Sequence, residues 1–285
     1  MIWQAMNTRS GFNNFNILRA QMKSFLFSIL FTLCYLYGFA QNKDARTNAL
    51  GGCGLTQATV WSNFSNQAGL ANINKFTFGL GSENQFLLSE LSRHTIACAI
   101  PVNGGVIGVN LNYFGFDLYN ETKIGLAFGK KLSKSFNIGI QLDYLGTYVN
   151  EGADNLHNFT FEVGVQKQLS KELVLGAHIF NPIGVKLNEE ENIPSVIELG
   201  LRYNANQKVS LFTEVSLESE QNGNLHLGLE YKIINELTLR TGFSTNPAKI
   251  SFGVGYNINN IQLDVAVKRH QLLGYSPQFS VSSAF

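Results

Sequence analysis

The feature that most constrains this chain is a two-residue alternation of apolar and polar side chains that recurs along residues 74–285. In residues 136–149, one phase is apolar and comprises Phe136, Ile138, Ile140, Leu142 and Tyr144, and the other carries Asn137, Gln141 and Asp143. Successive side chains point to opposite faces in a β-strand, so the pattern predicts strands with one apolar and one polar face. No apolar stretch in residues 41–285 approaches the roughly 20 residues that a membrane-spanning helix needs.

The composition of the polar face distinguishes a membrane barrel from a soluble β-sandwich. A sandwich turns its apolar face inward and exposes a charged face to water. Here the polar phase is rich in Gly, Ser, Thr, Asn and Gln, and charged residues make up only 14% of the chain. Charges are nearly absent from the middle of the apolar phase, where a Lys or Arg facing lipid would cost about 2–4 kcal/mol. The sequence therefore predicts an all-β fold, a transmembrane antiparallel β-barrel.

About fourteen strands are predicted, an even number, as is usual for bacterial barrels. They lie near residues 74–82, 92–101, 104–116, 120–132, 136–149, 156–169, 173–183, 195–204, 209–220, 224–234, 237–247, 249–259, 261–274 and 276–285. Tight turns such as 133–135 alternate with longer loops such as 184–194, so both ends of the barrel segment are expected on the periplasmic side. The last strand ends on Phe285, which resembles the signal that the barrel-assembly machinery recognises, and this machinery is an expected partner during biogenesis.

Residues 22–40 have the pattern of a signal peptide. Lys23 supplies a positive charge, an apolar run of about 13 residues follows, and small residues precede a cleavage site expected between Ala40 and Gln41. The run is too short for a membrane anchor. Residues 1–21 are interpreted as an upstream extension from a start codon assigned too early. Export together with the barrel pattern predicts an integral protein of the bacterial outer membrane, in contact with its lipids.

Residues 41–73 precede the first predicted strand and do not alternate. They contain Ala45-Arg46, then Leu50-Gly51-Gly52, and then Asn66-Gln67-Ala68-Gly69-Leu70. This pattern resembles the fatty-acid-transporter-like outer-membrane barrels and specifically their PorV/PorQ branch, in which the last element is usually Asn-Pro-Ala-Gly-Leu. Gln67 replaces that proline. The resemblance extends over residues 41–285 and implies a fourteen-stranded wall formed by residues 74–285, with residues 41–73 folded into the lumen as a plug.

Two cysteines, Cys53 and Cys98, follow the expected cleavage site. In an oxidising compartment they either form a disulfide between the N-terminal segment and an early strand or remain two isolated thiols. The sequence leaves both interpretations open.

Charged side chains recur on the polar phase of the later strands. They are Glu198, Arg202, Glu214, Glu230, Lys232, Arg240, Asp264 and Lys268. We interpret them as a mixed-sign ladder that fills and rigidifies the lumen, with a charged translocation path as the alternative. The five histidines show no metal-binding spacing and no accompanying catalytic motif, so no enzyme, metal or cofactor is expected. The sequence has no basic patch, so nucleic acid is not expected as a partner.

The first outward loop, residues 83–91, is the most informative local feature for function. It contains Phe86, Leu87, Leu88 and Leu91, and an exposed apolar cluster of this kind marks a ligand mouth or a partner surface. The PorV/PorQ resemblance implies an accessory or shuttle barrel that docks to a secretion or outer-membrane assembly complex. The wider superfamily implies a transporter of hydrophobic small molecules. The charge-filled lumen favours the accessory role, which is the leading hypothesis from the sequence.

Overall fold

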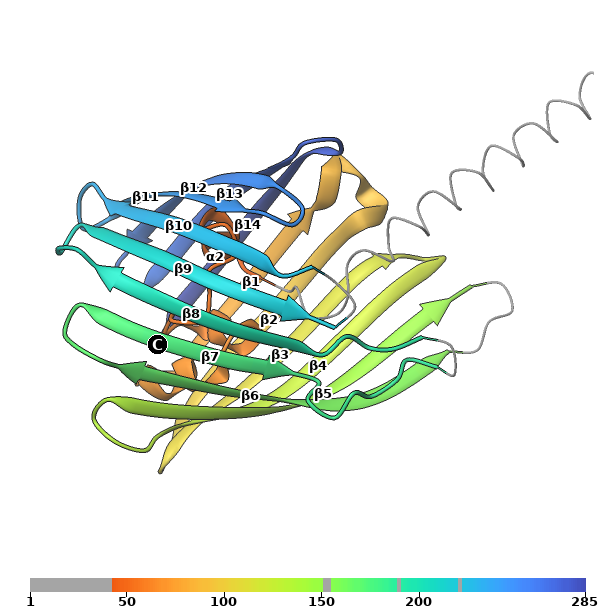
Figure 1. Cartoon of the computed structure of the whole chain (residues 1–285), viewed down its shortest axis with the longest axis horizontal. Coiled ribbons are helices and arrows are strands. Elements are labelled where there is room, and N and C mark those ends of the chain that lie inside the picture. Colours follow the sequence, from red (N-terminus) through yellow and green to blue (C-terminus); the bar gives the residue numbers. More distant parts are fainter. Residues whose placement is uncertain (1–42, 151–154, 189–190, 220–221) are drawn as a thin grey trace, which may run out of the picture. The chain divides into compact units, whose positions relative to one another are not determined.

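Fourteen antiparallel strands form one closed barrel in a computed structural model that describes residues 43–150, 155–188, 191–219 and 222–285 (Figure 1). The strands are β1 (Thr77–Asn84), β2 (Ser92–Val102), β3 (Gly105–Phe116), β4 (Tyr119–Lys131), β5 (Phe136–Val149), β6 (Leu156–Gln168), β7 (Leu173–Phe180), β8 (Val196–Asn204), β9 (Val209–Glu218), β10 (Asn224–Lys232), β11 (Leu237–Ser244), β12 (Lys249–Ile258), β13 (Ile261–His270) and β14 (Gly274–Ala284). Each strand pairs with its sequence neighbours, and β14 closes the ring by pairing with β1. The predicted all-β, antiparallel barrel of fourteen strands is confirmed.

The alternation of the sequence becomes the two faces of the wall. Every strand exposes apolar side chains on its outer face, for example Leu80, Ile96, Val109, Leu126, Leu142, Phe159, Leu175, Leu199, Leu211, Leu227, Leu239, Phe252, Val265 and Phe279. The opposite phase is buried inside and polar, as Asn110, Gln141, Thr160, Glu214 and Asp264 illustrate. Because the side-chain period of a strand is two, this register is fixed once the outer face is apolar.

The predicted strand boundaries differ from the observed ones mainly at the links. The predicted strand 173–183 ends at Phe180, and 261–274 ends at His270. The first strand begins at Thr77 rather than at residue 74, and it continues to Asn84. At Phe180 and His270 the ends are predicted too late because apolar residues continue into the link after ladder pairing has stopped.

The links define two ends of the barrel. The turn end carries the links 103–104, 132–135, 169–172, 205–208, 233–236 and 259–260, together with the start of β1 and the end of β14. The loop end carries the remaining links, among them 181–195. Three loop-end links, residues 117–118, 245–248 and 271–273, are as short as the turn-end links. The predicted separation of short and long links therefore holds for four of the seven loop-end links.

Residues 43–73, which we call the luminal segment, lie inside the barrel (Figure 1). They form the short helix α2 (Ala45–Ala49) and the 3₁₀ helices η1 (Val60–Phe64) and η2 (Gln67–Asn72). Asp44, Thr59 and Asn66 cap these helices by accepting a hydrogen bond from a backbone N–H of the first turn. Most side chains of the segment are buried against the inner wall. The expected cleavage site at Ala40 and Gln41 lies outside the described residues.

Candidate functional site in the lumen

One side of the luminal segment makes an apolar contact with the wall. Val60, Trp61, Phe64 and Leu70 form a single buried cluster with Ala97, Ala99, Val106 and Ala127 of β2, β3 and β4. The small wall residues leave room for the large side chains of the segment. The indole ring of Trp61 also lies against Gly79 of β1, where even a Cβ would approach the ring to 2.9 Å. Apolar burial of this kind is non-directional and stabilises the contact by about 25 cal/mol for each Å² removed from water.

The other side of the segment is held by ion pairs. Lys43 Nζ lies 3.4 Å from Glu198, and Arg46 donates to both carboxylate oxygens of Glu230 at 3.0 Å. Arg240 extends this ladder, because it contacts Glu230 at 2.7 Å and Asp264 at 2.6 Å. Cations of the luminal segment therefore neutralise acids of the later strands, and the predicted ladder consists of wall and segment residues together.

Burial and the neighbouring charges both act on the ionisable groups of the segment. Burial by itself lowers the pKa of Lys43, but the carboxylates of Glu198 and Glu214 outweigh it, and the pKa lies above its usual value. The pKa of Arg46 is raised in the same way, with Glu230 and Asp264 outweighing burial. The two side chains therefore stay cationic. Burial raises the pKa of Asp44, against the hydrogen bond from Thr47 that favours its charged form.

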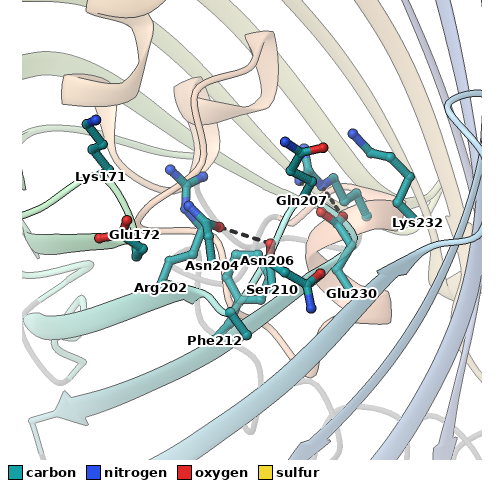
Figure 2. A pocket seen from close by; sticks show the side chains of 12 residues that line it. Lys171, Glu172, Arg202, Asn204, Asn206, Gln207, Ser210, Phe212, Glu230 and Lys232 are labelled. Atoms are coloured by element: carbon teal, nitrogen blue, oxygen red, sulfur yellow. Dashed lines mark hydrogen bonds and ion pairs between the residues drawn. The ribbon is translucent and has the colours of Figure 1, made fainter.

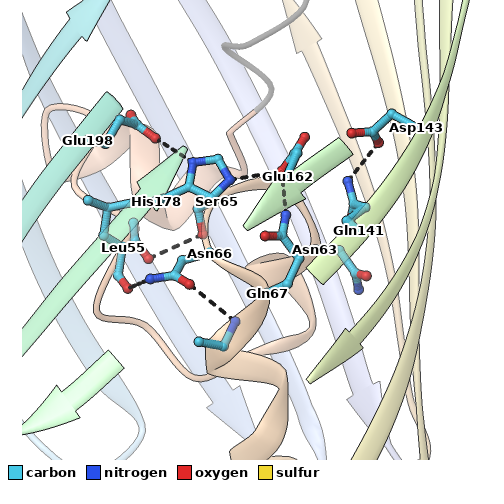
Figure 3. A network of polar contacts seen from close by, with 12 residues as sticks. Leu55, Asn63, Ser65, Asn66, Gln67, Gln141, Asp143, Glu162, His178 and Glu198 are labelled. Atoms are coloured by element: carbon cyan, nitrogen blue, oxygen red, sulfur yellow. Dashed lines mark hydrogen bonds and ion pairs between the residues drawn. The ribbon is translucent and has the colours of Figure 1, made fainter. Parts of the chain in front are cut away.

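A polar network joins the two sides across the wall of β4 to β8 (Figure 3). Glu162 is its centre and accepts from Lys123 and from the side-chain amide of Gln67. His178 bridges Glu162 at 2.9 Å and Glu198 at 3.2 Å. Since Glu198 also pairs with Lys43, the network connects η2 to the start of the luminal segment. Networks of this kind are costly to break, because each member left alone would be a buried charge.

The motif residues predicted at 66–70 are all buried inside the barrel. Asn66 caps η2 through its side-chain oxygen, while its amide nitrogen donates to the carbonyls of Leu55 at 2.9 Å and Val165 at 3.0 Å. Gln67 supplies the amide that reaches Glu162, a contact that a proline would not make. Gly69 is required because a Cβ there would collide with the Gln57 carbonyl and Ser62. The motif thus fixes η2 to the inner wall.

A cavity of about 570 Å³ lies at the turn end of the barrel, beside α2 (Figure 2). It is lined by Arg46, Lys171, Glu172, Arg202, Asn204, Ala205, Asn206, Gln207, Ser210, Phe212, Glu230 and Lys232. The side chain of Arg202 projects inward from β8, and Lys171 and Lys232 are exposed at the rim. The lining is therefore mostly polar and carries more positive than negative groups.

The predicted apolar loop cluster is only partly exposed. The loop forms two 3₁₀ turns, η3 (Gln85–Leu87) and η4 (Ser89–Leu91), with Leu87 67% and Leu88 42% exposed. Phe86 is half-buried, its N–H donates to Ser276, and its ring meets His270 edge-on. Leu91 is buried rather than exposed, because η4 turns it inward, so it is removed from the predicted contact surface.

Cys53 and Cys98 are free thiols that lie on opposite sides of the wall. Cys53 is buried in the luminal segment, whereas Cys98 belongs to the outward phase of β2. Burial raises the pKa of the Cys53 thiol well above its usual value. Of the two alternatives from the sequence, the structure has the isolated thiols.

Within residues 43–150, 155–188, 191–219 and 222–285, no helix is long and apolar enough to cross a membrane. Within the same ranges, no three side chains of the His, Cys, Asp and Glu types are grouped so as to hold a metal ion.

The closed barrel of fourteen antiparallel strands defines the class of the protein, which has the FadL-like barrel fold. It is similar to the toluene transporter TbuX of Ralstonia pickettii, with 12% identity over 87% of this chain and 99% of that one and a TM-score of 0.67. The P. putida toluene transporter TodX shares 14% identity over 86% of this chain and 99% of that chain, with a TM-score of 0.64. A Pseudomonas aeruginosa FadL homologue shares 13% sequence identity over 87% of this chain and 99% of that chain, with a TM-score of 0.65. No known protein family and no curated protein matches the sequence.

Sequence reasoning missed the residues through which the luminal segment holds the wall. Lys43 and Arg46 were not assigned as partners of the inward acids, and Lys123 was not identified as an inward cation. One signal was available: the luminal segment opens with two cations, while acids recur on the polar phase of the later strands. Which cation meets which acid depends on the path of a non-repeating segment, for which periodicity gives no register.

Proposed function

We propose that this protein is an outer-membrane barrel that transports hydrophobic small molecules. The observation that carries the proposal is the apolar contact between the luminal segment and β1 to β4. The side chains of the cluster around Trp61 and Leu70 meet the wall through apolar packing, and the indole Nε1 of Trp61 has no hydrogen-bond partner among the described residues. Beside the cluster, Asn63 donates to the Cys98 carbonyl at 3.1 Å, and its own carbonyl accepts from Asn110 at 3.4 Å. A shift of the segment on this side would break these two hydrogen bonds but no ion pair of the described residues, and it would uncover the apolar wall residues of the cluster. A hydrophobic molecule is the cargo that such a surface fits.

The inward face near the loop end supports the same cargo. Phe114, Leu145, Phe180 and Val196 point inward from β3, β5, β7 and β8 and are buried. All four belong to the loop-end halves of their strands. The structural neighbours add support, since two of them are described as toluene transporters and others as monoaromatic hydrocarbon channels.

The outer face supports a membrane location. Apolar side chains surround the barrel, with at least one on every strand, and soluble monomers rarely expose contiguous apolar patches larger than a few hundred Å². Tyr203, Tyr231 and Tyr256 lie on this face near the turn end, where interfacial aromatic residues concentrate in membrane barrels. Cell fractionation tests this part of the proposal, with recovery in the outer-membrane fraction as the expected result.

Uptake by whole cells tests the transport proposal. The chain is produced in a bacterial host that lacks hydrocarbon channels of its own, and entry of radiolabelled toluene is followed over time. We expect faster entry than in host cells with an empty vector, whereas entry of a polar sugar is unchanged. Equal toluene entry in both strains, with the folded barrel present in the outer membrane, would refute the proposal.

A reversible lock tests whether the luminal segment must move. A Cβ on Gly164 would lie 3.0 Å from Cγ of Asn66, so cysteines at 66 and 164 would have Cβ atoms within about 4.5 Å, a distance that a disulfide spans. In a Cys98→Ser background, we expect oxidised Asn66→Cys/Gly164→Cys protein to lose toluene uptake and to regain it on reduction. The two single-cysteine variants are the controls. If toluene uptake persists after the disulfide has formed, transport does not require η2 to move.

A second candidate function, an accessory barrel docked to a secretion or assembly complex, is favoured by the exposed leucines at the loop end. Leu87 and Leu88 are joined there by Leu272 of the β13–β14 link, which is 89% exposed. If this surface binds a partner, changing Phe86, Leu87 and Leu88 to Ser will abolish co-purification of that partner from native membranes. If the Ser variant recovers the same co-purifying proteins as the wild type, and the wild type takes up toluene, this surface does not have the accessory role. The PorV/PorQ branch stays a prediction.

A further inference from the structure

The cavity at the turn end has the size of a small-molecule site. Its volume of about 570 Å³ falls within the roughly 300–1,000 Å³ typical of ligand pockets. Its walls come from the β6–β7 link, β8, the β8–β9 link, β9 and β10, and from α2 of the luminal segment, which lies far from them in the sequence (Figure 2). The cavity is therefore lined by the luminal segment as well as by the wall.

The acids of the cavity are already occupied. Glu230 accepts from Arg46 and from Arg240, so both of its carboxylate oxygens have cationic partners. Glu172 accepts a hydrogen bond from the Ser170 hydroxyl and lies in an exposed turn. The lining has four cations and these two carboxylates, so a net positive charge remains that no group of the cavity neutralises.

Arg202 is the cation that most needs a partner. Among the described residues it forms no ion pair, and its Nε is buried without a hydrogen-bond acceptor. A buried donor left unsatisfied is costly, and a ligand that supplies an acceptor recovers that cost. The planar guanidinium fork matches a carboxylate, to which it donates two parallel hydrogen bonds. Lys171 and Lys232, which also form no ion pair in the described part of the chain, flank the opening.

We propose that this cavity binds the carboxylate of a small organic acid, with Arg202 as the principal contact and Lys171 and Lys232 at the rim. Asn204, Asn206 and Ser210 supply neutral polar groups around the body of the ligand. The site lies at the turn end, away from the apolar contact of β1 to β4, and it goes beyond transport of uncharged hydrocarbons. Binding at this site does not depend on the proposed transport, because it needs no movement of the luminal segment.

Equilibrium binding to the full-length barrel in lipid nanodiscs tests the inference, with benzoate as the probe. Benzyl alcohol has the same ring without the charge, and inorganic phosphate has charge without the ring. We expect benzoate to bind in calorimetry and the other two to bind at least about tenfold more weakly, since a hydrogen bond to a charged group is worth one factor of ten or more. Arg202→Gln should weaken benzoate binding about tenfold, and Lys232→Gln should weaken it less.

Lys208→Gln is the matched control, because Lys208 lies in the same β8–β9 turn but does not line the cavity. It should change benzoate affinity by less than about twofold, as expected for an exposed charge. Folding of each variant is checked by heat-modifiable mobility on a gel. The inference is overturned if Arg202→Gln and Lys208→Gln bind benzoate alike, if benzyl alcohol binds as well as benzoate, or if phosphate competes equally. Toluene uptake is measured separately, so a loss of either property identifies which proposal has failed.

Discussion

Leu227 and Glu230 lie three positions apart on β10 and point to opposite sides of the wall. Leu227 is 41% exposed on the outer face, whereas Glu230 faces the lumen and binds Arg46 and Arg240. We expect Leu227→Arg to reduce the yield of folded barrel in lipid bilayers, because a cation on the lipid face costs about 2–4 kcal/mol near the midplane. Leu227→Phe should fold normally and serves as the control. Equal heat-modifiable yields for the two variants would contradict the outward orientation.

The two cysteines allow a second test at the residue scale. Cys53 and Cys98 should both titrate as free thiols in unreduced, denatured protein, because the wall separates them. In the folded barrel Cys53 should resist a water-soluble maleimide, since burial hinders access and raises the pKa of its thiol, and the thiolate is the reactive form. Mass spectrometry after labelling checks both expectations. A Cys53–Cys98 disulfide in the isolated protein would contradict the structure.

The sequence predicts the direction of individual side chains but not their partners. Alternation places Glu198 and Glu230 inside correctly, because a strand has only two faces. It does not show that Lys43 meets Glu198 or that Arg46 meets Glu230, since these pairs join residues 155 and 184 positions apart. Leu91 shows the converse case, in which an apolar residue in a loop is buried by a local turn that no periodicity marks.

At the scale of elements, the turn that follows α2 is in close backbone contact with the wall. Gly242 of β11 faces the turn after α2, and a Cβ added there would collide with the backbone of Gly51. We expect Gly242→Val to displace this turn at a cost of about 1–3 kcal/mol, as overpacking does elsewhere. Arg46 should then become accessible to trypsin in the purified barrel. Leu239→Val, on the outward phase of the same strand, should leave cleavage unchanged.

Resistance of Gly242→Val to trypsin, with the barrel folded, would show that the turn after α2 contacts the wall in another way.

Strands and helices of this chain differ in how well the sequence predicts them. Strands were predictable because each repeats a two-residue pattern over several residues, and their ends were less certain because pairing stops before the pattern does. The helices α2, η1 and η2 have only five or six residues each, too few for a helical period, so their positions follow from caps and wall contacts.

At the scale of the whole molecule, the luminal segment and the wall can be separated. Deleting residues 43–73 leaves all fourteen strands in place. We expect the variant to conduct ions in planar bilayers at a clearly higher level than the intact protein, because a barrel wider than eight strands is not filled by its own inward side chains. The deletion leaves Glu198 and Glu230 without their cations from the segment, so the folded fraction is measured first. Unchanged conductance of a folded deletion variant would show that the segment does not close the lumen.

The hydrogen bond between Asn48 and Gln278 joins residues 230 positions apart, close to the two ends of the folded chain. The luminal segment is made first, yet its last partners lie on β14, the strand that completes the ring. Contacts this distant in sequence form slowly, since a long loop must close before they contribute. The order of events during biogenesis therefore follows from the geometry. We expect the segment to be gathered in while the sheet is still an open curve, and the seam between β1 and β14 to be sealed around it afterwards.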